Sequence, residues 1–198
     1  MELSVKIPSG VEVKIEGNVV SVKGPKGEVK KKMDAPTMKT RQEEGKIIFK
    51  SANGRKKNIS IVGTWVAHME NMINGVTSGW EVKMKIVYSH FPIKLSIEGD
   101  TVIIGNYLGE RGNREARIMA GSSIKLDKDG VVVTGVDKES VTQTAANIEL
   151  AARVKNRDRR VFQDGVYVVQ GPQVAGMTAD MTADAVGRSG SDSKNSKK

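Results

Sequence analysis

The sequence predicts an α+β protein with two tandem, similar domains, each an antiparallel β-sheet covered by one α-helix. Three observations support this prediction. Short segments of alternating apolar and polar residues open each half of the 198-residue chain. One amphipathic helical segment closes each half, and corresponding segments of the two halves carry matching apolar positions.

The first half begins with segments of the length and alternation typical of half-buried strands, at residues 3–7, 11–15, 19–23 and 47–50. The turn Gly24-Pro25-Lys26-Gly27 has proline in the second position and glycine in the fourth, as type I geometry prefers, so we expect it to close a hairpin. The same residues match the Gly-x-x-Gly loop with which KH domains grip nucleic acid. That loop joins two helices, however, whereas strands flank it here.

Residues 58–74 change to a helical period. Apolar residues recur there every three or four positions, which places them on one face of a helix. They are Ile59, Val62, Val66, Met69 and Ile73. We expect Gly75 and Gly79 to end this helix.

The second half repeats the order of strands followed by a helix. We expect strands at residues 81–88, 93–97, 101–104, 124–126 and 131–134, and a helix from about Lys138 to Val154. Asp137 is a suitable N-cap for that helix, and Ser140 with Gln143 offers an alternative capping box.

The two halves match at corresponding positions, which indicates an internal duplication. The helical positions Val62, Val66, Met69 and Ile73 correspond to residues 79 positions later, namely Val141, Ala145, Ile148 and Ala152. The strand positions Val11, Val13 and Ile15 correspond to residues 82 positions later, namely Ile93, Leu95 and Ile97. Chance similarity between amphipathic hairpins explains part of the match, and the change in displacement requires loops of different length.

These patterns divide the chain into an N-terminal domain at residues 1–79, a C-terminal domain at residues 80–173 and a tail at residues 174–198. Trp80 lies at the junction, where it is able to pack across it. After Pro172 the chain is rich in Gly, Ser, Thr, Ala and Asp, and Met177-Thr178-Ala179-Asp180 is repeated directly afterwards. We expect this tail to be disordered, because it has too little apolar surface to form a core.

Composition excludes several classes of protein. The longest apolar run is Val166 to Val169, far short of the roughly 18 residues that cross a bilayer, so we expect no membrane-spanning segment. The chain contains no cysteine, which excludes disulfides and thiolate metal sites and fits a reducing compartment. The net charge of +9 favours a polyanionic partner, with nucleic acid as the first candidate. The positive charge also suits an acidic membrane surface, but we expect no membrane partner because nucleic acid is the stronger candidate.

No local motif indicates catalysis. His68 and His90 have no second histidine at metal-ligand spacing, and Glu43-Glu44 is the only adjacent carboxylate pair. The glycines at 105, 109 and 112 lack the Gly-Lys-Ser/Thr ending of a phosphate-binding loop. We therefore expect no enzymatic activity, no cofactor, no metal and no small-molecule substrate.

The basic residues are unevenly placed. Residues 1–80 carry 14 basic and 8 acidic side chains, with a basic patch at Arg55, Lys56 and Lys57. Residues 81–173 carry 14 basic and 12 acidic side chains, and the excess lies where the second helix ends. The basic residues there are Arg153, Lys155, Arg157, Arg159 and Arg160. Helix-dipole complementarity accounts for Arg153 and Lys155, whereas the three later arginines predict a clamp on RNA backbone phosphates.

Two groups of segments resemble one known family. The run from Ile7-Pro8-Ser9-Gly10 through Gly24-Pro25-Lys26-Gly27-Glu28 is similar to the opening of the sixth protein of the large ribosomal subunit. Asn106-Tyr107-Leu108-Gly109-Glu110-Arg111 and Gln143-Thr144-Ala145-Ala146-Asn147-Ile148-Glu149 resemble its archaeal and eukaryotic branch, here in the archaeal form. The resemblance covers residues 1 to about 173.

The resemblance implies a cytoplasmic, non-enzymatic component of the large ribosomal subunit, bound to large-subunit ribosomal RNA mainly through the second domain. It also implies a place near the factor-binding region, beside other large-subunit ribosomal proteins. The family's RNA-contacting loop corresponds to residues 155–160, which adds Asn156 to the candidates, and we also include Arg111 and Arg114. The alternative is a free-standing RNA-binding architectural protein or RNA chaperone.

Overall fold

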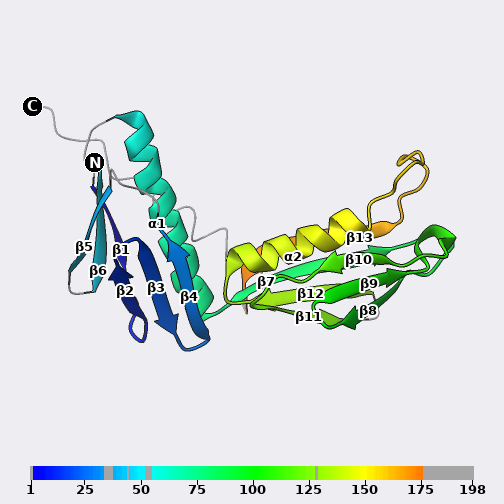
Figure 1. The fold of residues 1–198 in the computed structure, drawn as a ribbon, viewed down its shortest axis with the longest axis horizontal. Helices are drawn as coiled ribbons and strands as arrows, with labels where there is room; N and C mark the ends of the chain where they lie inside the picture. The colour runs from blue at the N-terminus through cyan, green and yellow to red at the C-terminus, as the bar shows by residue number, and fades with distance from the viewer. Residues whose placement is uncertain (1, 34–37, 44, 52–54, 128, 176–198) are drawn as a thin grey trace, which may run out of the picture.

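The computed structural model describes residues 2–33, 38–43, 45–51, 55–127 and 129–175. These residues form two α+β halves joined end to end (Figure 1). None of the described helices is long and apolar enough to cross a membrane.

The first half contains six strands and one long helix. Its strands form two antiparallel three-stranded sheets, in the orders β1-β6-β5 and β2-β3-β4. The bounds are β1 (Glu2–Lys6), β2 (Glu12–Glu16), β3 (Val19–Gly24), β4 (Gly27–Lys32), β5 (Met38–Glu43), β6 (Lys46–Ser51) and α1 (Lys56–Thr77). The helix contacts strands of both sheets, so both bury an apolar face against it.

The second half repeats this arrangement and adds one strand. Its sheets have the orders β10-β9-β8 and β11-β12-β7-β13. The bounds are β7 (Trp80–Val87), β8 (Lys94–Glu98), β9 (Thr101–Gly105), the short 3-10 helix η1 (Tyr107–Gly109), β10 (Arg114–Arg117), β11 (Ser122–Leu126), β12 (Gly130–Gly135), α2 (Lys138–Ala151) and β13 (Gly165–Val174). Apart from β13, strand pairing in the two halves is the same, which confirms the duplicated α+β architecture.

The apolar stripes of the helices supply the two cores. Val62, Met69, Val141 and Ile148 are all buried, and the corresponding pairs differ by the 79 positions that the sequence predicts. One core cluster contains residues from Val5 to Val76, and the other contains residues from Trp80 to Val166. Along the chain, the first cluster ends at Val76 and the second begins at Trp80.

Both helix ends differ in detail from the prediction. Gly75 lies inside α1, which continues to Thr77, and Gly79 follows the helix with a left-handed φ of 79°. The second helix ends at Ala151 rather than Val154, since the chain turns away to reach β13. Asp137 is its N-cap and accepts hydrogen bonds from the backbone N–H groups of Glu139 and Ser140, whereas the alternative capping box does not form.

Three edge strands were not predicted. They are β5 and β10, which are polar, and β13, which contains the apolar run Val166 to Val169. By contrast, β4 is the second strand of the hairpin that the turn Gly24-Pro25-Lys26-Gly27 predicts. Pro172 and two register irregularities interrupt β13, which is tolerated because its outer side pairs with no strand of the described chain. Val174, the first residue of the predicted tail, still pairs with Trp80, and the Ala175 N–H donates to the Gly79 carbonyl at 2.9 Å. The rest of the predicted tail, residues 176–198, lies outside the described residues.

The two halves meet at the C-terminal part of α1. Trp80 Nε1 donates to the Asn71 carbonyl at 3.1 Å, so this side chain does pack across the junction. Lys138 Nζ lies over the Trp80 ring, 4.6 Å from its centroid, and donates to Asn71 Oδ1 at 3.2 Å. Lys31 of β4 pairs with Glu139 at the start of α2. These contacts hold the end of α1 against the start of α2.

Candidate nucleic-acid interface

The predicted arginine loop connects α2 to β13. Its two ends are anchored, because Ala152, Val154 and Asp164 are buried. Between them, the residues Lys155, Asn156, Arg157, Asp158, Arg159 and Arg160 are exposed, as is Arg153. The loop therefore presents its cations to solvent from a fixed base.

A local turn sets the direction of the last two arginines. The carbonyl of Asp158 accepts from the N–H groups of Val161 and Phe162, and its Oδ1 accepts from the Arg160 N–H at 2.9 Å. Asn156 adopts a left-handed φ of 57°, which asparagine tolerates better than most residues. The Arg157 guanidinium group lies 5.1 Å from the centroid of the Phe162 ring.

Three loops gather at the end of the second half that is remote from the first half (Figure 1). We call residues 88–93, 106–113 and 152–164 the distal loops. Ser89 N–H donates to Asp164 Oδ1 at 3.2 Å, and the Tyr107 hydroxyl donates to the Asp164 carbonyl at 2.8 Å. Asn106 Nδ2 donates to the Pro92 carbonyl at 3.1 Å. Arg111 is exposed on the same loop cluster, so the structure brings it together with the arginine loop.

Arg114 is used inside the protein instead of facing outward. Its Nη1 atom donates to the carbonyls of Ala151 and Arg153, at 3.0 and 2.7 Å, where α2 leaves its last carbonyls unpaired. The other guanidinium nitrogens bind both carboxylate oxygens of Glu110, and the group lies 3.9 Å from the centroid of the Tyr107 ring. We therefore leave Arg114 out of the proposed RNA contacts, because its donors are already occupied.

Charge coupling links these loops. The hydrogen bond from Arg114 is the main cause that holds the pKa of Glu110 below its usual range, and Arg157 and Lys155 add to the effect. Burial raises the pKa of the Tyr107 hydroxyl, which keeps this group protonated as a donor to Asp164. The distal loops thus combine a buried, hydrogen-bonded support with an exposed cationic surface.

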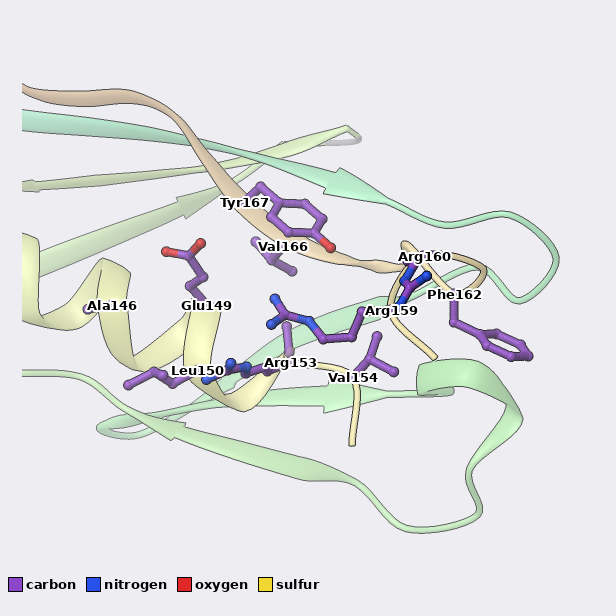
Figure 2. Close-up of a pocket in the computed structure, with 11 residues that line it drawn as sticks. Ala146, Glu149, Leu150, Arg153, Val154, Arg159, Arg160, Phe162, Val166 and Tyr167 are labelled. Atoms are coloured by element: carbon purple, nitrogen blue, oxygen red, sulfur yellow. The ribbon is translucent and has the colours of Figure 1, made fainter. Parts of the chain in front are cut away.

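A pocket of about 520 Å³ lies between α2 and β13, beside the arginine loop (Figure 2). Arg153, Arg159 and Arg160 supply cations to its lining, and Glu149 supplies one carboxylate. The remaining lining side chains are apolar or aromatic: Ala146, Leu150, Ala152, Val154, Phe162, Val166 and Tyr167. Sequence reasoning missed this pocket, although Tyr167 stands in the apolar run Val166 to Val169 that it had noted.

The basic patch of the first half lies elsewhere. Arg55, Lys56 and Lys57 are exposed at the N-terminus of α1, far from the distal loops (Figure 1). The structure does not bring the two basic groups together. Other lysines of the first half face the junction, since Lys26 donates to the Ser78 carbonyl and Lys31 pairs with Glu139.

The described residues contain no cluster of three or more His, Asp or Glu side chains with the arrangement of a metal site. The exposed aromatic residues Tyr88 and Phe91 belong to the distal loops, although the sequence shows no aromatic pair on a single strand. Their clustering depends on loop packing, because the Phe91 ring lies against Gly109.

Comparisons with known proteins give one consistent result. The family model described as Ribosomal protein L6 matches residues 7–79 and 91–165. Each matched segment covers most of one half of the fold, which agrees with the repeated strand order.

Individual relatives are similar over most of their length. The Large ribosomal subunit protein uL6 of Methanospirillum hungatei is 47% identical over 169 residues, covering 85% of this chain and 96% of the relative. The protein of the same name from Methanothrix thermoacetophila is 46% identical over 164 residues, covering 83% and 93%. That of Methanosarcina mazei is 43% identical over 167 residues, covering 84% and 95%.

Proposed function

This chain belongs to the ribosomal protein L6 family, and from that premise we propose that it binds large-subunit ribosomal RNA through its distal loops. Its role is that of a structural, non-enzymatic component of the large ribosomal subunit. We further propose that it lies near the factor-binding region, beside neighbouring ribosomal proteins, in cytoplasmic ribosomes.

The single observation that carries the RNA proposal is the geometry of the arginine loop. It places Arg157, Arg159 and Arg160 on the surface between two buried anchors, with no carboxylate other than Asp158 inside the segment. Arginine is suited to phosphate because its planar fork donates two parallel hydrogen bonds. Since the anchors fix the loop, little conformational entropy is lost when it binds.

The proposed mechanism is electrostatic positioning. Arg153, Lys155, Asn156 and Arg111 extend the surface around the three loop arginines. Phosphate contacts release counterions and fix the orientation of the protein on folded RNA without reading its sequence. The contacts across the junction, from Trp80 and Lys138 to Asn71 and from Lys31 to Glu139, then set the position of the first half relative to that RNA.

The test compares two triple variants of the full-length chain. Reversal of charge at Arg157, Arg159 and Arg160 should weaken binding to large-subunit ribosomal RNA more than reversal at Arg55, Lys56 and Lys57. For neutral substitutions of the loop arginines, the slope of log affinity against log salt should become shallower by roughly two to three units, at about 0.9 per phosphate contact. An unchanged slope for the loop variant, with a changed slope for the α1 variant, would place the main contact in the first half.

Sedimentation distinguishes this function from that of a free-standing RNA chaperone. A subunit component should comigrate with large ribosomal subunits in moderate salt, because many contacts dissociate together only rarely. A chaperone should instead spread over many RNAs and leave the subunit fraction when the salt concentration rises.

A further inference from the structure

The pocket between α2 and β13 contains an aromatic ring, a carboxylate and apolar side chains as well as arginines. Contact with phosphates alone requires only the arginines. We propose that it holds one unpaired base of the RNA, a base that carries an exocyclic amino group, with Tyr167 as the surface on which the base stacks. This inference rests on the proposed function, because the occupant belongs to the RNA that the distal loops bind.

Tyr167 is held in place as a stacking surface. Its hydroxyl donates to the Gln163 carbonyl at 3.0 Å, which fixes the outer end of the ring. A Cβ at Gly165 would lie 3.1 Å from three atoms of the Tyr167 side chain, so the ring rests closely against the backbone of Gly165. The side chain is still 38% exposed and lines the pocket. A supported ring with a free surface is the arrangement on which unpaired RNA bases stack.

The interior of the pocket suits a base better than it suits a phosphate. Val154 and Val166 form a buried apolar floor, and Leu150 contributes apolar surface from the α2 side. A phosphate loses hydration against such a floor without gaining a partner there. The flat faces of a base gain from the same contact, because they are largely apolar.

Glu149 gives the pocket its selectivity. A carboxylate repels phosphate but accepts hydrogen bonds from the amino groups of bases. None of the ion pairs in the described part of the chain involves Glu149, so its oxygens are free to accept. Adenine, cytosine and guanine carry an amino group on the Watson–Crick edge and uracil does not, which excludes uracil as the preferred occupant.

The arginines around the base site serve the attached backbone. Arg153, Arg159 and Arg160 line the same pocket (Figure 2). The Arg160 side chain is almost fully exposed and lies beside Asp158. Guanidinium groups at this position are able to bind the phosphates on either side of an extruded nucleotide. The cations and the stacking ring therefore act on one nucleotide and its neighbours.

The experiment uses the full-length protein, large-subunit ribosomal RNA and three variants. Tyr167→Ala removes the ring, Ala146→Phe fills the pocket without changing its charge, and Ala67→Phe is the control on the exposed face of α1. Tyr167→Ala should weaken binding by about 5- to 150-fold, which corresponds to the loss of one stacked base. The salt dependence should not change, because no charge is removed.

Base-specific chemical probing gives the second measurement. The wild-type protein should protect one A, C or G at its Watson–Crick edge, and Ala146→Phe and Tyr167→Ala should both remove this protection while Ala67→Phe retains it. Amide NMR spectra of each variant show whether its fold is intact, and Ala146→Phe keeps the test decisive if Tyr167→Ala disturbs β13.

Any one of the following outcomes would overturn the inference. They are a protected uracil, a wild-type footprint that persists when the pocket is filled, or a filled pocket that impairs only assembly with other ribosomal proteins. The last result would assign the pocket to a protein side chain. Failure of the wild-type protein to bind the RNA would contradict the proposed function itself. If the wild-type protein binds with the expected salt slope, and if Tyr167→Ala and Ala146→Phe bind as tightly as it does, only the base site is contradicted.

Discussion

At the scale of single residues, Arg114 connects three parts of the second half. It joins the last carbonyls of α2 to Glu110 of the loop after β9, and it lies over the buried ring of Tyr107. Lysine cannot replace this arrangement, because it lacks the planar fork that binds two carboxylate oxygens at once. From the sequence, we expected Arg153 and Lys155 to be the cations that complement the dipole of α2 at its C-terminal end. In the structure, the cation that binds carbonyl oxygens there is Arg114, which comes from β10.

We predict that Arg114→Ala lowers the free energy of unfolding by about 2 to 3 kcal/mol, because a largely buried cation gives up several charge-assisted hydrogen bonds. Urea unfolding followed by circular dichroism measures this change. Arg111→Ala is the control, and its effect should stay within about 0.5 kcal/mol because the side chain is exposed. Unchanged stability of Arg114→Ala together with lost RNA affinity would return Arg114 to the RNA contacts.

His68 makes the junction sensitive to pH. Burial is the main cause that lowers the pKa of His68, Lys31 lowers it further, and Glu139 opposes them. Since the folded protein binds this proton less readily than the unfolded chain, the contribution of His68 to stability is complete above the usual pKa of about 6.5. That contribution is lost as the pH falls below this value.

We therefore predict that lowering the pH from about 8 to about 5.5 reduces the urea midpoint more for the wild-type protein than for His68→Gln. Parallel pH profiles for the wild-type protein and His68→Gln would show that this histidine does not couple protonation to folding.

At the scale of elements, α1 approaches the second half closely at one glycine. A Cβ at Gly75 would lie 2.0 Å from the Val136 carbonyl oxygen and 3.1 Å from Trp80 Nε1. Gly63, on the same helix, has no atom within 4 Å of the corresponding position. Substitution by alanine at Gly63 therefore reports only the helix preference for alanine over glycine. Substitution at Gly75 adds the steric cost of a Cβ against the Val136 backbone.

We predict opposite effects for the two substitutions. Gly75→Ala should destabilise the protein by about 1 to 3 kcal/mol, because backbone at the junction has to move apart. Gly63→Ala should stabilise it by about 0.5 to 1 kcal/mol, since alanine loses less entropy in a helix. Thermal unfolding of both variants measures the difference, and equal effects of the same sign would contradict the close approach.

At the scale of the whole molecule, the core is divided although the halves touch. Each half has its own apolar cluster, and most contacts across the junction are polar or involve Trp80. We predict that residues 79–175 fold without the first half and give a well-dispersed amide NMR spectrum. This fragment includes Val174 and Ala175, which complete β13. A collapsed spectrum would mean that the second half requires α1.

We also predict that deletion of residues 176–198 leaves the free energy of unfolding and the RNA affinity almost unchanged. The deleted segment holds three acidic and four basic residues, so it adds little net charge to the RNA-binding surface. Urea unfolding and RNA titration of the shortened chain provide the measurements. A clear loss of affinity would assign RNA contacts to this segment.

The sequence by itself determined the elements whose signals are local. Alternation located β2, β3, β8 and β9, and helical spacing located the buried faces of α1 and α2, because each pattern depends on neighbours within a few residues. Asp137 was identified as a cap for the same reason, since it binds N–H groups two and three residues later. The strands β5 and β10 lacked such a pattern because they are almost entirely polar, which an edge strand tolerates, and β13 lacked it because two register irregularities and Pro172 break its alternation.

Only the tertiary structure decided which distant residues share one surface. The contacts of Asp164 with Tyr107 and Ser89 span 57 and 75 positions, and that of Arg114 with Ala151 spans 37. These separations explain why sequence reasoning found the arginine loop, whose charge is concentrated within eight residues, but did not foresee the internal hydrogen bonds of Arg114 and missed the pocket beside the loop. Charge density is a local property of the chain, whereas the burial of a guanidinium group or the support of a tyrosine ring depends on how separate elements pack.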